Sequence, residues 1–508
     1  MEDTAINKIT KGAFIVFLAV IISKLLTYLY RILIARIGPE EYGIISIGFA
    51  VIGIVSIVSL FGLEDGLTRY ISYYKAKKNT KILNYIYSLS AKITLALSII
   101  FGIIIFHYAG YLSANIFHDQ RTYFLLRVFA IIIPFYGIYK INLATLRGLQ
   151  EIKLWSYIGN IGESMIKLVI LLFVIFLGYE LGGVIVGYAL TILAISVISF
   201  VYVRKKLPKN SIKNHLYNKE ILGYSWPLMF SNALVTLIVW IDTILLGYFL
   251  APSDVGIYNA AVPTANLLSI LPIALIVPFV PVLTGLLALK RKKEFEFNYN
   301  TITKWLFLLN LPIFAFLVLF SKDMLSILFG VAYAQGSSVL ALVALGYLIY
   351  FSLDTSTKLL VILKRTRLVF VNTLIATILS IAINIMLIPR LGIIGAGIGT
   401  SSFFILINFL SLTESYKITK MFPIKLSYLK PIIAVSIISL VIKLIKDLYP
   451  VKHIMYLALY ALIFFVAYFA LVLLFKTLTK EELNIITNIE SKIGLRLSII
   501  TKFVRRFV

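Results

Sequence analysis

Long apolar stretches separated by short polar segments recur along almost the whole chain. Most are about 20 residues long, which is the length that an α-helix needs to cross roughly 30 Å of hydrocarbon. They lack the strict alternation of polar and apolar positions that a membrane-spanning β-strand shows. The pattern therefore predicts an all-α membrane protein with about fourteen transmembrane helices, at residues 12–36, 43–63, 83–107, 122–140, 155–178, 181–203, 221–250, 257–287, 304–320, 336–363, 368–388, 392–413, 428–448 and 453–475.

Composition and charge agree with a membrane location. Hydrophobic residues make up 60% of the 508 residues and charged residues only 14%, a balance that a soluble chain could not bury. The net charge of +26 is concentrated in segments such as 204–206 and 290–293. We interpret these clusters as topology signals and contacts with anionic lipids, not as a nucleic-acid surface. They predict a multi-pass protein of the cell membrane with both termini in the cytoplasm.

The sequence shows no constellation of catalytic residues. It has no cysteine, which excludes disulfides and thiolate metal sites, and its four histidines lack metal-ligand spacing. It contains no nucleophile elbow and no Walker motif. We therefore expect neither enzyme activity nor a metal or cofactor, and H⁺ or Na⁺ remains a candidate coupling ion.

Short motifs repeat at a nearly constant distance along the chain. The corner "IGPEEYGIISIG" at 37–48 is echoed by "LAPSDVGIYNAA" at 250–261, and Asn160 is matched by Asn372. The separation is 212 or 213 positions in each case, which indicates a duplication. Because each half holds six helices, both copies enter the membrane from the same side, as parallel repeats do.

The duplication predicts the division of the chain into domains. These are an N lobe at 1–204, a cytoplasmic linker at 205–220, a C lobe at 221–414, two added helices at 415–476 and a cytoplasmic amphipathic tail at 477–508. At the repeated corner, prolines end one helix and glycines permit a tight external reversal into the next. We interpret these residues as a structural turn; they are Pro39, Gly43, Pro252 and Gly256.

Charges inside the predicted helices are the strongest indication of a functional site, because each costs at least about 2.5 kcal/mol at mid-bilayer. Lys24 and Arg31 lie two turns apart on one face of the first helix. Both can face one cavity, although Arg31 alone could extend to the outer surface and Lys24 could belong to a buried pair.

Three further charges lie within predicted spans. Glu163 and Lys167 stand four residues apart on one helix, where a structural ion pair is the favoured interpretation. Asp242 is the only acid well inside a span of the second half. It could pair with a first-helix cation, carry a coupling ion or be structural.

Repeated prolines mark the eighth predicted helix. Each removes a backbone hydrogen bond, which suits a helix that bends beside a cavity, although a static kink has the same signature. We assign a gating role to this helix on the basis of Pro263, Pro272, Pro278 and Pro281.

Four segments resemble the polysaccharide flippases of the multidrug/oligosaccharidyl-lipid/polysaccharide exporter superfamily. They are "RILIARIGPEEYGIISIG" (31–48), "LRGLQEIKLWSYIGN" (146–160), "YSWPLMFSNALVTLIVWIDTILLGYFLAPSDVGIYNAA" (224–261) and "LFGVAYAQGSSVLALVAL" (328–345). The resemblance implies two six-helix lobes around a central cavity that opens alternately to each side. It also implies that a glycan on a polyprenyl or dolichyl phosphate carrier moves from the cytoplasmic to the external leaflet. In the related lipid II flippases, cations of the first helix line the cavity, which points to Lys24 and Arg31 as the phosphate-binding residues.

Two alternatives stay open at this point. A multidrug or organic-cation antiporter of the same superfamily would favour acids and aromatic residues over lysine and arginine in the first lobe. A membrane glycan polymerase or ligase would need a large external loop, which the sequence lacks. For the flippase, the expected partners are the lipid-linked glycan, membrane lipids and glycosyltransferases but not nucleic acid, and we expect a monomer.

Overall fold

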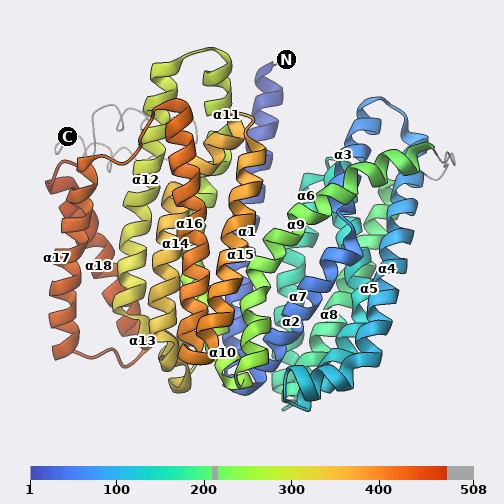
Figure 1. The fold of residues 1–508 in the computed structure, drawn as a ribbon, viewed down its shortest axis with the longest axis horizontal. Coiled ribbons are helices and arrows are strands. Elements are labelled where there is room, and N and C mark those ends of the chain that lie inside the picture. Colours follow the sequence, from blue (N-terminus) through green and yellow to red (C-terminus); the bar gives the residue numbers. More distant parts are fainter. Residues whose placement is uncertain (1, 209–215, 478–508) are drawn as a thin grey trace. The chain divides into compact units, whose positions relative to one another are not determined.

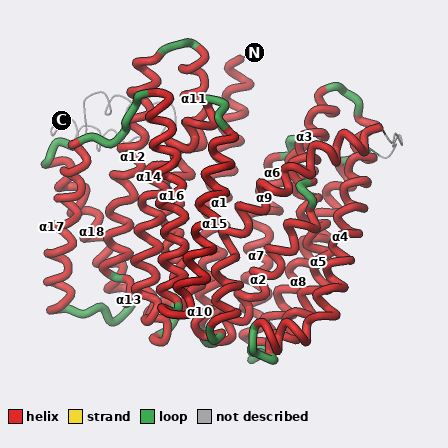
Figure 2. Tube along the Cα trace, viewed as in Figure 1, coloured by secondary structure: helices red, strands yellow, loops and turns green. Residues whose placement is uncertain are grey.

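The computed structural model describes residues 2–208 and 216–477, and helices account for nearly all of this part of the chain (Figures 1 and 2). No β-strand occurs within these ranges. Thirteen of the described helices are long and apolar enough to cross a membrane. The predicted all-α membrane fold is therefore confirmed. The predicted tail lies outside the described residues except for Thr477, as does the middle of the linker.

The helices pack into two units, one formed by 1–260 with 381–399 and the other by 261–380 with 400–508. The first contains α1 (Glu2–Ala35), α2 (Pro39–Leu60), α3 (Leu63–Ala76), α4 (Leu83–Tyr111), α5 (Arg121–Gly148), α6 (Ile152–Ser156), α7 (Glu163–Phe176), α8 (Leu181–Lys206) and α9 (Leu216–Phe249). The second contains α11 (Ile270–Ala288), α12 (Lys292–Leu319), α13 (Ser321–Leu328), α14 (Ser337–Ile362), α17 (Leu429–Leu448) and α18 (Ile454–Leu474). Three helices run through both: α10 (Pro252–Ala265), α15 (Thr366–Leu391) and α16 (Ile393–Thr419).

The boundaries of the two packing units differ from the boundaries of the two predicted lobes. Helix α9 follows the predicted linker, yet it packs against α2 and α3 of the first unit. The aromatic ring of Tyr224 on α9 lies 4.1 Å from the Arg69 guanidinium carbon, and Tyr70 of α3 donates a hydrogen bond to the Glu220 carbonyl of α9. The lobe boundaries remain a prediction from the sequence repeat.

The predicted eighth helix at 257–287 is not one continuous helix. It is divided into the end of α10, the short 3₁₀ segment η4 (Asn266–Ser269) and α11. Pro263 lies within α10, and the other three prolines of this region lie within α11. Because each proline lacks an amide donor, an unbroken ladder of helical hydrogen bonds cannot form here. The thirteen candidate spans among the described residues include neither α10 nor α11, whereas the sequence predicted about fourteen spans.

Helix α3 is amphipathic and lies outside the thirteen spans. Its buried side chains recur at helical spacing, at Leu63, Leu67, Tyr70, Ile71 and Tyr74. They pack into a core with residues from the cytoplasmic ends, in the predicted topology, of α4 and α5. The reversal from α2 into α3 is made by Phe61 and Gly62, which both have left-handed backbone angles. This turn places the first residues of α3 beside α5 and α9.

The two copies of the repeated corner contact each other reciprocally within the first unit. A Cβ atom added to Gly43 would lie 1.8 Å from the carbonyl oxygen of Pro252, and one added to Gly256 would lie 1.9 Å from the carbonyl oxygen of Pro39. Such an exchange, in which each copy offers the same atoms to the other, is expected of two equivalent corners about a local twofold axis. Glycine is required here because the two backbones approach too closely for any side chain.

In the second unit, α17 and α18 pack against each other and against α12 (Figure 1). The Tyr468 hydroxyl of α18 donates to the Leu308 carbonyl of α12 at 2.9 Å. Lys446 of α17 forms an ion pair with Asp323 of α13 and also donates to the Leu319 carbonyl at 3.0 Å. These polar contacts attach the two added helices to the rest of the unit.

Gly43→Ala and Gly256→Ala should each destabilise the protein, because the new methyl group overlaps a carbonyl oxygen of the opposite corner. Over-packing of this kind costs about 1–3 kcal/mol, which should appear as a lower unfolding temperature of the detergent-solubilised protein. Gly182→Ala is the matched control, since nothing lies within 4 Å of its Cβ position. Equal unfolding temperatures for all three variants would contradict the close contact.

Candidate substrate-binding cavity

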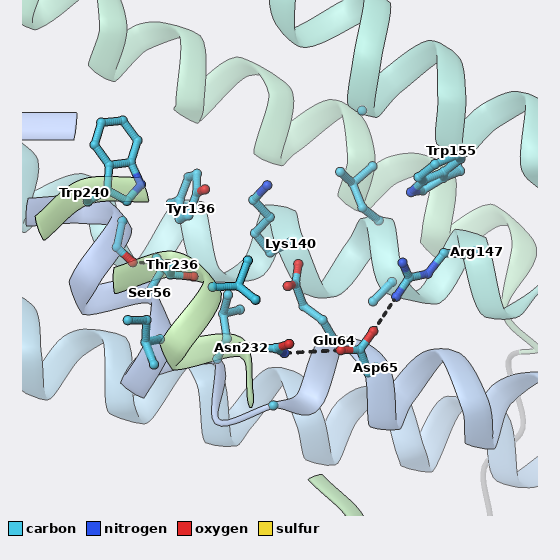
Figure 3. A pocket seen from close by; sticks show the side chains of 18 of the residues that line it. Ser56, Glu64, Asp65, Tyr136, Lys140, Arg147, Trp155, Asn232, Thr236 and Trp240 are labelled. Carbon is cyan, nitrogen blue, oxygen red and sulfur yellow. Dashed lines mark hydrogen bonds and ion pairs between the residues drawn. The ribbon is translucent and has the colours of Figure 1, made fainter. Parts of the chain in front are cut away.

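A polar cavity of about 520 Å³ lies within the first unit. Its walls come from α2, α3, α5, α9 and the segment from α6 to η3 (Tyr157–Gly162) (Figure 3). Its side chains are unusually polar for a helical bundle of the membrane. The charged and hydrogen-bonding residues are Ser56, Glu64, Asp65, Tyr136, Lys140, Arg147, Trp155, Asn160, Asn232, Thr236 and Trp240.

One ion pair crosses the cavity wall. The Arg147 guanidinium lies 3.0 Å from Asp65 Oδ1 and also donates to the Thr68 hydroxyl at 3.1 Å. The Asn232 amide of α9 donates to Asp65 Oδ2 at 3.2 Å. Asp65 is in the first turn of α3 and Arg147 in the last turn of α5, so each charge is also favoured by its helix dipole. Because both side chains are about 40% exposed, the pair contributes only about 0–1 kcal/mol to stability, and its main effect is to orient the cavity's polar groups.

Glu64 and Lys140 are a second pair of opposite charges. They lie between the ends of the cavity without direct contact (Figure 3). Among the described residues, no carboxylate oxygen lies within 4.0 Å of Lys140 Nζ, which instead lies 5.2 Å from the Tyr136 ring. Burial raises the pKa of the Glu64 carboxyl at the start of α3, and the positive charge of Lys140 opposes this shift. With all four groups ionised, two carboxylates and two cations give the cavity a formal charge of zero.

Aromatic side chains stand at both ends of this charged region. Figure 3 shows Trp240 and Tyr136 at one end and Trp155 beside Arg147 at the other. The cavity thus combines flat apolar surfaces with charged groups and side-chain amides. Ligand pockets typically have this combination, in which aromatic residues supply contact area and a few polar groups fix orientation.

The predicted phosphate-binding residues are not part of this cavity. Lys24 is half-buried on α1, and Arg31 donates a hydrogen bond to the Tyr42 hydroxyl at 3.2 Å. Tyr42 in turn donates to the Asn259 carbonyl of α10 at 2.9 Å. Arg31 is therefore connected to the repeated corner, and the phosphate-binding role of both cations remains a prediction.

Glu163 and Lys167 lie together on α7, again outside the cavity. Their charged atoms are 3.9 Å apart. Glu163 also accepts a hydrogen bond from the Tyr139 hydroxyl at 2.8 Å, and Lys167 Nζ lies 4.9 Å from the centre of the Tyr30 ring. Each charge thus has a second partner besides the other.

Asp242 is buried in the C-terminal part of α9, with 4% of its surface exposed. It accepts hydrogen bonds from the Tyr258 hydroxyl at 2.8 Å and from the Asn384 side-chain amide of α15. These contacts hold its carboxylate in a fixed orientation. They do not distinguish a structural role from an ion-coupling role, and the latter remains a prediction.

Sequence reasoning missed the four charged residues of the cavity. Glu64 and Asp65 follow the second apolar stretch directly, and Lys140 and Arg147 stand seven residues apart at the end of the fourth. Seven residues are two turns, so both cations lie on one face of α5. That spacing was a usable signal, but the contact between α5 and the turn after α2 could not be read from the sequence.

These features define a multi-pass helical membrane protein with a polar cavity among its helices. A sequence model of the family described as "Polysaccharide biosynthesis protein" matches residues 9–287, more than half of the chain, and the protein belongs to that family. A second model, MatE, matches residues 227–386. The family resemblance that the sequence predicted is confirmed.

Individual relatives are distant but cover most of the chain. Stage V sporulation protein B of Bacillus subtilis (strain 168) is 22% identical over 82% of this chain and 84% of its own length. The putative O-antigen transporter of Shigella flexneri is 22% identical over 72% of this chain and 87% of its own. Among solved structures, the lipid II flippase MurJ in an inward closed conformation shares the fold, with a TM-score of 0.71 and 16% identity over 91% of this chain and 98% of that one.

The charge of the cavity should depend on pH through Glu64. Because its pKa is raised, Glu64 takes up a proton at a higher pH than an exposed glutamate would, and the formal charge then changes from zero to +1. Since the chain has no cysteine, a Thr236→Cys variant carries a single thiol in the cavity. We expect its labelling by an anionic methanethiosulfonate, relative to a neutral one, to rise as the pH falls.

The same measurement on a Glu64→Gln background provides the control. The neutral glutamine should keep the ratio of anionic to neutral labelling high and nearly constant with pH. A ratio that varies equally in both backgrounds would show that another group titrates in this range.

Proposed function

We propose that the protein flips polyprenyl- or dolichyl-(pyro)phosphate-linked oligosaccharide from the cytoplasmic to the external leaflet, by alternating access of its two lobes. The observation that carries this proposal is the cavity of about 520 Å³, which is lined by charges, amides and aromatic rings within a bundle of apolar helices. Membership of the polysaccharide biosynthesis family supports it. So do its relatives, among them the putative O-antigen transporter and, among solved structures, the lipid II flippase MurJ.

The chemistry of such a substrate requires a cavity of this kind. Glycan hydroxyls and phosphate oxygens cannot enter hydrocarbon without losing their hydrogen bonds to water, at a cost of several kcal/mol for each uncompensated group. A polar cavity replaces those hydrogen bonds while the hydrocarbon tail of the carrier stays in lipid. Under the predicted topology, Glu64, Asp65 and Arg147 lie at cytoplasmic helix ends, where the substrate would enter.

We also propose a role in flipping for each of the remaining predicted residues. Lys24 and Arg31 bind the phosphate of the carrier. Asp242, with Glu163 and Lys167, sets the charge inside the first unit or carries a coupling H⁺ or Na⁺. The helix interrupted at η4 bends as the gate, and the reciprocal corners at Gly43 and Gly256 close the external side. We place the protein in the plasma membrane with cytoplasmic termini, as a monomer that works with glycosyltransferases.

A multidrug or organic-cation antiporter is the second candidate, because the MatE model matches residues 227–386. Such a transporter would exchange its substrate for H⁺ or Na⁺. The buried carboxylate of Asp242 is the group that would carry this exchange. Efflux of a cationic dye that Asp242→Asn abolishes would favour this function over glycan flipping. A membrane glycan polymerase or ligase would instead form product from a lipid-linked donor.

Reconstituted protein should expose a lipid-linked glycan to the opposite leaflet of a liposome. The probes are polyprenyl diphosphate N-acetylglucosamine and dolichyl phosphate glucose, and the measurement is their accessibility to a glycosidase or a lectin added outside. We expect transfer to be at least tenfold faster than in protein-free liposomes for one of these probes. No acceleration with either probe would contradict the proposed function.

The double variant Lys24→Gln/Arg31→Gln should lose this transfer, because the phosphate would lose both of its proposed positive partners. Lys81→Gln is the matched control, since Lys81 is an exposed cation of the segment that follows α3. Equal unfolding temperatures would show that both variants are folded. Flipping at the wild-type rate by the double variant would reject the phosphate-binding role.

A further inference from the structure

We infer that the cavity of the first unit is a sugar-binding subsite for an uncharged part of the glycan, and that the carrier phosphate is bound elsewhere. This inference rests on the proposed function and names the part of the substrate that this site takes. It follows from the balance of charges in the cavity, from its free hydrogen-bonding groups and from its aromatic ends.

The balance of charges disfavours an anionic guest. Asp65 already neutralises Arg147 at 3.0 Å, so a phosphate would have to displace that carboxylate to reach the guanidinium. Lys140 is the other cation, but Glu64 lies beside it across the cavity (Figure 3). A phosphate that approached Lys140 would therefore also approach an acid, and the repulsion would offset much of the attraction. An uncharged guest meets neither penalty.

The polar groups that line the cavity suit hydroxyls instead. The Glu64 carboxylate accepts no hydrogen bond from any described side chain, although it lines the cavity. It can therefore accept from sugar hydroxyls, in charge-assisted bonds that are about twice as strong as neutral ones. Lys140 can donate to hydroxyl oxygens, and Asn160 and Thr236 offer both donors and acceptors. A hydroxyl both donates and accepts, so it can use all of these groups at once.

The aromatic side chains match the other face of a sugar. A pyranose ring presents an apolar surface of C–H groups as well as its rim of hydroxyls. Trp240 with Tyr136 and, at the other end, Trp155 provide flat surfaces against which such rings can pack (Figure 3). The volume of about 520 Å³ falls within the range of about 300–1,000 Å³ that is usual for small-ligand sites. The cavity thus fits a short stretch of neutral glycan.

Protection of a cavity thiol by free disaccharides tests this inference on the full-length protein. In the Thr236→Cys variant, the rate of labelling by a neutral maleimide is measured at about pH 8 in detergent. The probes are chitobiose and cellobiose, each compared with a disaccharide in which one hexose is replaced by its uronic acid. We expect at least one neutral disaccharide to slow labelling threefold or more, and its acidic counterpart to slow it far less at the same concentration.

Two pairs of variants separate a sugar site from simple obstruction. Trp240→Ala should abolish protection, whereas Trp226→Ala should not, because Trp226 is on the same helix but half exposed and outside the cavity. Glu64→Gln should shift the preference toward the acidic disaccharide, since the cavity then carries a net positive charge. Glu64→Asp should keep the preference for the neutral one.

Three results would overturn the inference: equal or better protection by the acidic disaccharide in the unaltered cavity, no protection by any of the disaccharides, or protection that survives Trp240→Ala. The flipping assay is scored separately on the same preparations. Flipping without disaccharide protection would reject the subsite and leave the proposed function standing. Protection without flipping of lipid-linked probes would reject the proposed function and retain the sugar-binding site.

Discussion

The cost of removing a charge from water governs how this protein is built. Two acids inside the apolar helices, away from the cavity, have polar partners: Glu163 has Lys167 and the Tyr139 hydroxyl, and Asp242 has Tyr258 and Asn384. Within the cavity the rule is met differently, because Glu64 and Lys140 balance each other in formal charge without direct contact. That pair keeps its hydrogen-bonding capacity for a guest, which a closed salt bridge would have used. Glu163 and Asp242 have direct partners, whereas Glu64 and Lys140 offset each other in formal charge without contact. This difference distinguishes the candidate binding site from structural pairs.

Helix α9 connects the features of the first unit. Its first turns pack on α3 through Tyr224 and Glu220, its middle carries the cavity residues Asn232 and Trp240, and Asp242 lies only two residues further on. A guest that contacts Trp240 therefore acts on the helix that also holds the buried carboxylate. This arrangement gives a physical route by which glycan binding and the protonation or ion occupancy of Asp242 could influence each other.

Much of the fold could be predicted from the sequence because apolar stretches long enough to cross a membrane indicate transmembrane helices. Apolar stretches of about 20 residues leave the backbone no alternative to helices, and the repeated corner was visible as Pro39–Gly43 against Pro252–Gly256. The sequence could not show that these corners would touch each other. That contact depends on how two segments more than 200 residues apart are brought together. It becomes evident only in the structure, where a Cβ atom added to Gly43 or Gly256 would lie 1.8 or 1.9 Å from a carbonyl oxygen of the opposite corner.

The site was harder to predict because three of its four charged residues lie outside the predicted apolar spans. Lys24 and Arg31 are costly in hydrocarbon, so they stand out in the sequence. Glu64, Asp65 and Arg147 stand at helix ends, where charged residues are expected to contact water and therefore do not by themselves indicate a site. The turn at Phe61 and Gly62 folds α3 back beside α5 and α9, and this brings the charges of the helix ends around one cavity.

A cavity without net charge also fits the work of a transporter that must return empty. A cavity lined only by cations would have to change its exposure with uncompensated charge each time the substrate left, and the unpaired groups would then meet a less polar environment. In the empty cavity Asp65 already pairs with Arg147, and Glu64 and Lys140 offset each other in formal charge. The same balance lowers affinity for an ionic guest, so under the proposed function the phosphate would be bound by residues outside the cavity. Lys24 and Arg31, which do not line the cavity, are the residues to which the proposed function gives this role.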